Sequence, residues 1–288
     1  IEAALAEDAS DNDRYVCASL LKNAQSASSY ILPLCQDTGI ANIFSWIPPG
    51  VLIPDNARSI ISSAVFDVYR DHNLRFSTTV PQDFYNEKDP QNNLPCQTFL
   101  FNEKAVPSFS DEAETHASFL FCAKGGGSSN KTVFIQGTKA DLTEDKFDAL
   151  LQEKIKTLGT SACPPYTIAV VAGGLSPEQN LMTLKLATCG CVLENENSFR
   201  DEKLEQRVME IARTAGYGAQ FGGTKAAVDA IVIRLPRHGA SCPVSIGVSC
   251  SAHRNLKTFI TKDGLYIEKT VTNLLGIEGF TQAVSFAE

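Results

Sequence analysis

The sequence has 288 residues, of which 43% are hydrophobic and 20% are charged, and its 33 acidic and 25 basic residues give a net charge of −8. A chain of this length buries a sizeable apolar core without disulfides. The acidic balance argues against a nucleic-acid partner, because phosphate binding needs a basic surface. No apolar run approaches the roughly 18 residues of a membrane span, so we expect no membrane partner.

The expected secondary structure mixes helices and short strands, which we infer from the spacing of apolar residues. In chain order, we expect helices at Val16 to Ile31 and Ile61 to His72, strands at Thr98 to Asn102 and Ser118 to Ala123, a helix at Phe147 to Leu158, a strand at Thr167 to Val171, helices at Ser176 to Leu184 and Leu204 to Ala215, and strands at Val228 to Leu235, Val244 to Val248, Thr258 to Lys262 and Leu265 to Lys269. Asp263 and Gly264 indicate a hairpin between the last two strands.

Helices and strands do not alternate strictly enough for a doubly wound fold. We therefore predict an α+β fold with a mixed, partly antiparallel sheet. No stretch reads as a clean linker, so we expect a single domain over residues 1–288.

The cysteine content indicates the compartment. Nine cysteines is an odd number in a chain too large to need a disulfide framework, which is typical of a reducing compartment. The first ten residues are acidic and rich in alanine, unlike a signal peptide. We therefore expect a cytoplasmic protein.

A run of three glycines, Gly125 to Gly127, lies in a segment that nearly matches a phosphate-binding P-loop. The glycine required before the lysine is replaced by Asn130, and the residues that follow favour a strand over a helix. Nucleotide binding is therefore the weakest reading. A tight turn between two strands, or a backbone that closely approaches another ligand, explains the same glycines.

Three cysteines lie among glycine, proline and small polar residues, which indicate turns at the ends of strands, where functional residues collect. They are Cys35, Cys163 and Cys250. By contrast, Cys17, Cys96 and Cys122 lie within helical or strand patterns and read as small buried hydrophobic residues. Spacing alone leaves open whether the first three are metal ligands or core residues. His238 also lies at a predicted strand end, although a lone histidine is more often structural.

Several blocks of the sequence resemble the class I, iron–sulfur-dependent fumarase and L(+)-tartrate dehydratase family. They occur in the family's order and extend from about Leu32 to Lys269, which corresponds to the α subunit or to the N-terminal half of single-chain relatives. The blocks are Leu34-Cys35-Gln36-Asp37-Thr38-Gly39, Asn73 to Ser77, Lys124 to Lys131, Thr160 to Tyr166, Ala219 to Gly223 and Arg237 to Pro243.

The resemblance implies a cofactor and its ligands. In this family a 4Fe-4S cluster is held by three cysteines, and the matching positions are Cys35, Cys163 and Cys250. One iron then has no protein ligand and can act as a Lewis acid on the substrate. Such an exposed iron implies an oxygen-sensitive hydro-lyase.

The resemblance also implies roles for individual side chains. Gln36 and Asp37 would contact a small dicarboxylate substrate, and Asp37 with His238 would deliver a proton to the leaving hydroxyl. Arg75 would grip a substrate carboxylate through two hydrogen bonds. The backbone amide of Gly126 would contact the substrate, so that the glycine run binds a carboxylate.

The family's second half, which carries the proton-abstracting base, is not contained in this sequence. We therefore expect a β subunit or C-terminal domain as a partner, and a dimer of catalytic units. Fumarate/malate is the expected substrate pair, with L(+)-tartrate or mesaconate/citramalate as alternatives. From another class, an electron-transfer or non-catalytic iron–sulfur protein would need a fourth cysteine, for which Cys242 is the candidate.

Overall fold

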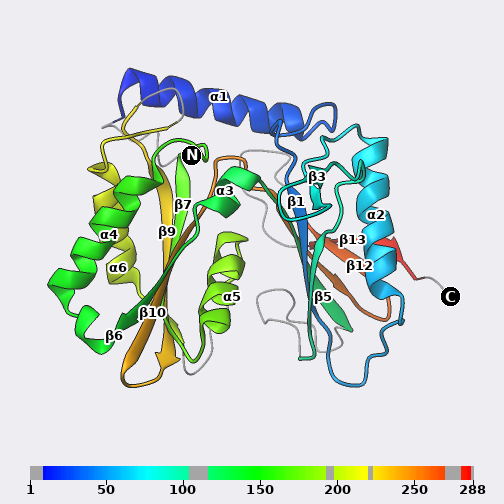
Figure 1. Ribbon diagram of the computed structural model, residues 1–288. Coiled ribbons are helices and arrows are strands. Elements are labelled where there is room, and N and C mark those ends of the chain that lie inside the picture. Colours follow the sequence, from blue (N-terminus) through cyan, green and yellow to red (C-terminus); the bar gives the residue numbers. More distant parts are fainter. Residues whose placement is uncertain (1–8, 104–115, 193–197, 220–222, 270–279, 287–288) are drawn as a thin grey trace. The chain divides into compact units, whose positions relative to one another are not determined.

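The computed structural model describes residues 9–103, 116–192, 198–219, 223–269 and 280–286 (Figure 1). The chain forms two compact units, each built from two separate segments. Unit 1 comprises residues 1–24 and 126–253, and unit 2 comprises residues 25–125 and 254–288. The chain therefore passes between the units three times, and neither unit is one continuous stretch. The single domain over residues 1–288 stays a prediction.

Unit 1 is a five-stranded mixed sheet with helices on both faces (Figure 1). Its strand order is β6 (Val133–Thr138), β10 (Ser241–Ser249), β7 (Tyr166–Gly174), β9 (Ala227–Arg237) and β8 (Phe199–Arg200). Strands β7 and β9 are parallel, whereas β10 runs antiparallel to β6 and β7. The mixed directions confirm the predicted α+β class.

Alternating side chains of β7 assign the helices of unit 1 to opposite faces of its sheet. Ile168 and Val170 pack with the helices α4 (Glu144–Leu158) and α6 (Glu202–Arg213). Ala169 and Val171 point the other way and pack with α5 (Pro177–Thr188). Because successive residues of a strand face opposite sides, a strand covered on both faces is apolar throughout.

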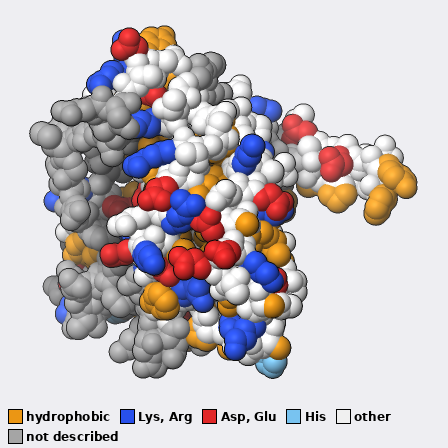
Figure 2. Space-filling view, turned by 90° about the vertical axis from the view of Figure 1, so that its left-hand side faces the viewer, with side chains coloured by type: hydrophobic (Ala, Val, Ile, Leu, Met, Phe, Trp, Pro, Cys, Tyr) orange, Lys and Arg blue, Asp and Glu red, His pale blue; other side chains and the backbone are white. Residues whose placement is uncertain are grey.

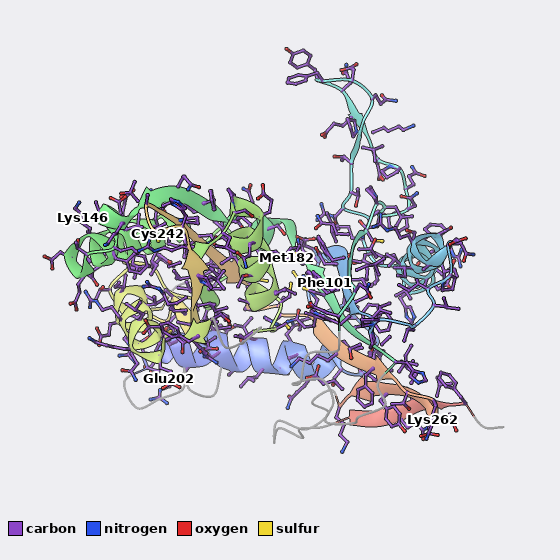
Figure 3. All side chains as sticks on the ribbon, turned by 90° about the horizontal axis from the view of Figure 1, so that it is seen from below. Phe101, Lys146, Met182, Glu202, Cys242 and Lys262 are labelled. Carbon is purple, nitrogen blue, oxygen red and sulfur yellow. The ribbon has the colours of Figure 1, made fainter. Side chains whose placement is uncertain are left out.

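Unit 2 contains a six-stranded sheet and the helix α2 (Ala57–Asp71). The strand order is β13 (Phe280–Ser285), β12 (Gly264–Glu268), β11 (Asn255–Ile260), β5 (Ala117–Lys124), β1 (Ile40–Trp46) and β4 (Gln97–Phe101). Strands β1 and β4 are parallel, and the other neighbours are antiparallel. Phe101, labelled in Figure 3, stacks on its parallel partner Trp46 with ring centroids 5.3 Å apart. Such cross-strand aromatic pairs stabilise the sheet.

Five further elements complete the described chain. The helix α1 (Asp11–Ala27) begins in unit 1 and ends in unit 2. The strands β2 (Val80–Pro81) and β3 (Glu87–Lys88) form a small hairpin, and α3 (Gly126–Asn130) is a short helix after β5. A single 3-10 turn covers Lys139–Asp141.

The glycine run differs from one of its predicted forms. A tight turn between two strands is wrong, because Gly126 and Gly127 begin the helix α3 and the flanking strands β5 and β6 belong to different sheets. The expected hairpin is confirmed, since Ile260 of β11 pairs with Leu265 of β12.

Candidate functional site

The segment Cys35 to Gly39 forms a fixed loop that leads into β1 of unit 2. The Tyr69 hydroxyl donates hydrogen bonds to the carbonyl oxygens of Thr38 and Gly39, at 3.1 and 2.7 Å. Burial raises the pKa of the Tyr69 phenol, which keeps it protonated and able to donate. Gly39 has a φ of +81°, and an added Cβ would lie 2.9 Å from the carbonyl carbon of Lys124. The loop therefore passes the end of β5 at a distance that only glycine permits.

Asn93 ties this loop to the segment that carries Arg75. It is fully buried, and its Nδ2 donates to the Gly39 carbonyl oxygen at 3.1 Å. Its Oδ1 accepts from the Ser77 amide at 2.8 Å. Thr38 Oγ1 donates to the carbonyl oxygen of Arg75 at 2.7 Å, while the Arg75 side chain is exposed. The backbone of Arg75 is thus fixed beside the Asp37 loop, and its guanidinium faces solvent.

Asp37 presents its two carboxylate oxygens to different surroundings. Oδ1 accepts a hydrogen bond from the Gly39 amide at 3.1 Å, which closes a local turn. Oδ2 lies beside Gly125, where an added Cβ would come within 2.9 Å of it and within 3.5 Å of Arg254 Nη2. Arg254 also donates from Nη1 to the main-chain oxygen of Asp37 at 2.5 Å. Any side chain at position 125 would therefore collide with the Asp37 carboxylate, so glycine permits this close approach.

In unit 1, Cys163 and Cys250 lie at the same end of the sheet. Cys163 precedes β7 and Cys250 follows β10, and these strands are antiparallel, with Ser249 opposite Thr167. The amide of Ser251 donates to the carbonyl oxygen of Cys163 at 3.1 Å, which joins the two cysteine segments directly. Neither residue forms a disulfide, and both are half-buried.

The glycine run has one functional neighbour in each unit. Gly125 faces Asp37 in unit 2, whereas an added Cβ on Gly127 would lie 3.3 Å from the Cα of Ala162, next to Cys163 in unit 1. Gly126, the predicted substrate contact, lies between these two glycines in the sequence and is exposed to solvent. Close approach to other site segments therefore accounts for two of the three glycines without a bound phosphate.

His238 lies at the opposite end of the unit 1 sheet from Cys163 and Cys250. It follows β9, whose Arg237 pairs with Gly174 at the far end of β7. The nine residues of β10 separate the two ends by roughly 26 Å at about 3.3 Å per residue. His238 is exposed, and its Nδ1 accepts from the Ala240 amide at 3.2 Å. Unit 1 therefore does not bring His238 to its two cysteines.

Cys242 lies at that same far end and is 1% exposed (labelled in Figure 3). It packs in the apolar core with Val244 and Ile246, and burial raises the pKa of its thiol. A residue at the start of β10 cannot share a metal centre with Cys250, which follows the end of that strand. This geometry argues against Cys242 as a fourth cluster ligand.

Exposure separates the nine cysteines, none of which forms a disulfide. Five are buried, namely Cys17, Cys122, Cys189, Cys191 and Cys242, and four are half-buried. Of those four, Cys96 lies 3.7 Å from the Ser62 hydroxyl, and the other three are the predicted ligands Cys35, Cys163 and Cys250. Three accessible thiols suit an iron–sulfur cluster, because thiolates are the preferred ligands of such clusters.

These three cysteines are divided between the units, Cys35 in unit 2 and the other two in unit 1. Accordingly, no group of three or more His, Cys, Asp or Glu side chains is close enough to hold a metal ion within the part of the chain that the structure describes. Three cysteine thiols are the donor type that an iron–sulfur cluster takes.

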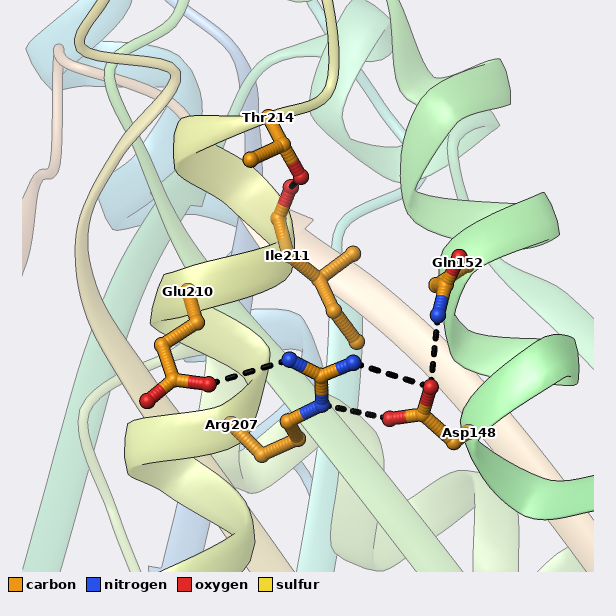
Figure 4. Close-up of polar contacts among 6 residues, drawn as sticks. All are labelled: Asp148, Gln152, Arg207, Glu210, Ile211 and Thr214. Carbon is orange, nitrogen blue, oxygen red and sulfur yellow. Dashed lines mark hydrogen bonds and ion pairs between the residues drawn. The ribbon is translucent and has the colours of Figure 1, made fainter. Parts of the chain in front are cut away.

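A separate cavity of about 670 Å³ lies on unit 1 between α4 and α6. Acidic and basic side chains intermingle over this face (Figure 2). Arg207 binds Asp148 through two hydrogen bonds, at 2.5 and 2.9 Å, and Glu210 at 3.0 Å (Figure 4). These charges compensate one another and join the two helices, which is a structural role.

No helix in the described segments combines the length and apolar character that crossing a membrane requires.

Comparisons with known proteins agree with the predicted family. The family model described as fumarate hydratase (Fumerase) matches residues 1–258. The class I, anaerobic fumarate hydratase of Escherichia coli K12 is 47% identical over 273 residues, or 92% of this chain and 48% of the relative. The mitochondrial fumarate hydratase 1 of Leishmania major is 43% identical over 270 residues, or 91% of this chain and 48% of the relative.

A third relative matches over most of its own length. It is the putative L(+)-tartrate dehydratase subunit alpha of Methanocaldococcus jannaschii, 25% identical over 260 residues, or 88% of this chain and 87% of the relative. The chain thus spans about half the length of the two fumarate hydratases and nearly all of an α subunit.

Proposed function

Because the chain belongs to the fumarate hydratase (Fumerase) family, we propose that it is the cluster-bearing component of a class I hydro-lyase. Its reaction is the reversible addition of water to the double bond of a dicarboxylate, with fumarate and malate as substrate and product. The observation that carries this proposal is the identity of 43–47% to class I fumarate hydratases over more than nine-tenths of the chain.

Cys35, Cys163 and Cys250 would hold a 4Fe-4S cluster through three thiolates. The cluster, when bound, supplies a Lewis acid at the iron that has no protein ligand. The half-buried thiols and the hydrogen bond between the segments of Cys163 and Cys250 support this assignment.

Asp37 would hold the proton that the leaving hydroxyl group receives during dehydration. Its Oδ1 accepts a hydrogen bond from the Gly39 amide and its Oδ2 lies beside Gly125, so the carboxylate is fixed in the loop that follows Cys35. Gln36, next to Asp37 and exposed, would contact the same substrate. Its neighbour Cys35 would place both residues beside the cluster.

Arg75 would bind one substrate carboxylate through two hydrogen bonds, because its planar guanidinium matches a carboxylate. Its exposed side chain on a fixed backbone supports this role. The exposed amide of Gly126 would provide a further contact. The participation of His238 in proton delivery stays a prediction, and it requires His238 to reach a site away from its own end of the sheet.

The proton-abstracting base and a second carboxylate clamp would come from a β subunit or a C-terminal domain. Two observations support such a partner: the chain spans about half of the fumarate hydratases, and its tartrate dehydratase relative is named as an α subunit. Addition across a double bond from opposite faces also needs groups on both sides of the substrate. We further propose a dimer of such catalytic units.

The test compares the chain alone with the chain plus its second half, both prepared without oxygen. Iron content is measured first, and hydration of fumarate, dehydration of L(+)-tartrate and hydration of mesaconate are then assayed. We expect the chain alone to bind iron and turn over nothing, and the pair to hydrate fumarate. Asp37→Asn in the pair is the matched control, which should keep iron and lose turnover.

Three results would overturn parts of this proposal. Turnover by the chain alone, at the rate of the pair, would place the base within residues 1–288. Activity on tartrate or mesaconate in place of fumarate would change the substrate. A cluster whose spectrum is unaltered by any dicarboxylate would favour an electron-transfer protein, because only an open iron responds to a new ligand.

A further inference from the structure

Arg254 contacts the Asp37 loop although it belongs to none of the sequence blocks that resemble the family. It lies one residue before β11, and its carbonyl oxygen accepts a hydrogen bond from the Ala123 amide at 3.0 Å. Its Nη1 donates to the main-chain oxygen of Asp37. Arg254 therefore links the end of β5, through its main-chain oxygen, to the loop that holds the proposed proton carrier, through its side chain.

The backbone of this loop is held at three consecutive carbonyl groups. Tyr69 and Asn93 bind the carbonyls of Thr38 and Gly39, and Arg254 binds that of Asp37. The carbonyl held by Arg254 belongs to Asp37 itself and is bonded to the same Cα that carries the carboxylate side chain. Rotation of this peptide group would therefore turn the side chain.

The guanidinium group also lies near the Asp37 carboxylate. An added Cβ on Gly125 would lie 2.9 Å from Asp37 Oδ2 and 3.5 Å from Arg254 Nη2, so both atoms lie close to the Gly125 backbone. Arg254 is half-buried, and its Nε is a buried atom with no hydrogen-bond partner among the described residues. Withdrawing a cation from water costs free energy, which the hydrogen bond to the Asp37 carbonyl oxygen helps to offset.

We propose that Arg254 is a positioning residue that fixes the main chain of Asp37 and thereby holds its Oδ2 beside Gly125. This inference rests on the proposed function, since it gives Arg254 its effect through the proton carrier. It assigns Arg254 no contact with the substrate.

The test uses the active pair, with Arg254→Ala, Arg254→Lys and the control Arg70→Ala. Arg70 lies in the same unit and is exposed, and the side chains of its ion pairs with Asp67 and Asp71 are each about half exposed to water. We expect Arg254→Ala to lower kcat about 10- to 100-fold, since small displacements of a reacting group have effects of this size. KM and iron content should stay near those of the unsubstituted protein. Lysine keeps a cationic donor, so Arg254→Lys should recover part of the loss.

A double-mutant cycle separates positioning from other roles. If Arg254 acts through Asp37, adding Arg254→Ala to Asp37→Asn causes no further loss of kcat. Losses that multiply, or a raised KM with kcat unchanged, would overturn the proposal and indicate a direct substrate contact. A fall in iron content or in melting temperature that matches the lost activity would overturn it in favour of a purely structural role.

A readout without turnover keeps this inference distinct from the proposed function. The Gly39 amide is hydrogen-bonded to Asp37 Oδ1, so its hydrogen exchange reports the position of that side chain. Arg254→Ala should speed exchange in the Cys35 to Gly39 loop, and Arg70→Ala should not. If the pair acts on none of fumarate, L(+)-tartrate and mesaconate, the proposed function fails. Unchanged hydrogen exchange in Arg254→Ala would instead refute the positioning role itself.

Discussion

Removing the charge of Asp13 should destabilise unit 1 and change how its stability depends on pH. Asp13 lies in α1 and is fully buried. Its carboxylate accepts hydrogen bonds from the amides of Thr224 and Lys225, at 2.7 and 3.1 Å, and from the hydroxyl groups of Ser10 and Thr224, at 2.5 and 3.0 Å. These bonds attach α1 to a segment more than 200 residues later in the chain.

The size of the effect follows from the pKa of Asp13. Burial alone raises this pKa, but the hydrogen bonds from Ser10, Thr224 and Lys225 outweigh it and lower the value from 3.8 to about 2. A difference of roughly 1.8 pKa units corresponds to about 2.4 kcal/mol of folding free energy. Since the folded pKa is the lower one, this stabilisation is present above about pH 4 and is lost as the pH falls toward 2.

The assay is urea unfolding of Asp13→Asn and of the unsubstituted protein at neutral pH and at several values between about pH 4 and 2. At neutral pH we expect the variant to lose about 2 kcal/mol, and its stability should fall less steeply with acid. Asp11→Asn is the matched control, because Asp11 is an exposed acid one half-turn away on the same helix. Equal acid dependence of Asp13→Asn and the unsubstituted protein would refute the reasoning.

Four further predictions concern the proposed site. Replacing any of the proposed ligands Cys35, Cys163 and Cys250 by serine should remove iron, measured by iron analysis, because a hydroxyl cannot replace a soft thiolate. Cys122→Ser should retain iron. Arg75→Lys should raise KM more than it lowers kcat, since it keeps the charge and loses the second hydrogen bond. Air should inactivate the enzyme within hours and a dicarboxylate should slow the loss, since substrate covers the open iron. Mixing the inactive variants His238→Asn and Asp37→Asn should restore turnover, because His238 can then serve a site in a second copy, and a mixture as inactive as its components would contradict this.

Elements with strong local signals could be predicted from the sequence. Ser176 caps α5 and accepts from the Gln179 amide at 3.3 Å, and Gly159, with a φ of +58°, ends α4. The Asp263-Gly264 hairpin also forms as its turn residues indicate. In these cases the controlling interactions lie within a few residues of one another.

Elements controlled by distant contacts were missed. The strand β1 (Ile40–Trp46) is buried along most of its length, so its apolar residues do not alternate with polar ones. The helix α3 consists of Gly, Ser and Asn, which favour helices poorly, and no spacing pattern marks it. The passage of the chain between the two compact units likewise has no sequence signal, because no linker composition marks it.

The residues of the candidate site fall into two groups. The proposed reaction requires the cysteine thiolates, the Asp37 carboxylate and the Arg75 guanidinium by residue type, so a sequence pattern can reveal them. Tyr69, Asn93 and Arg254 instead donate to main-chain carbonyls, which every residue has, and a donor of another type at another position could do the same. Arg254 and Asp37 are 217 residues apart, so no local motif contains both. Motif analysis can therefore identify the reacting groups of such a site, but the residues that aim them become visible only when the fold places them beside the same loop.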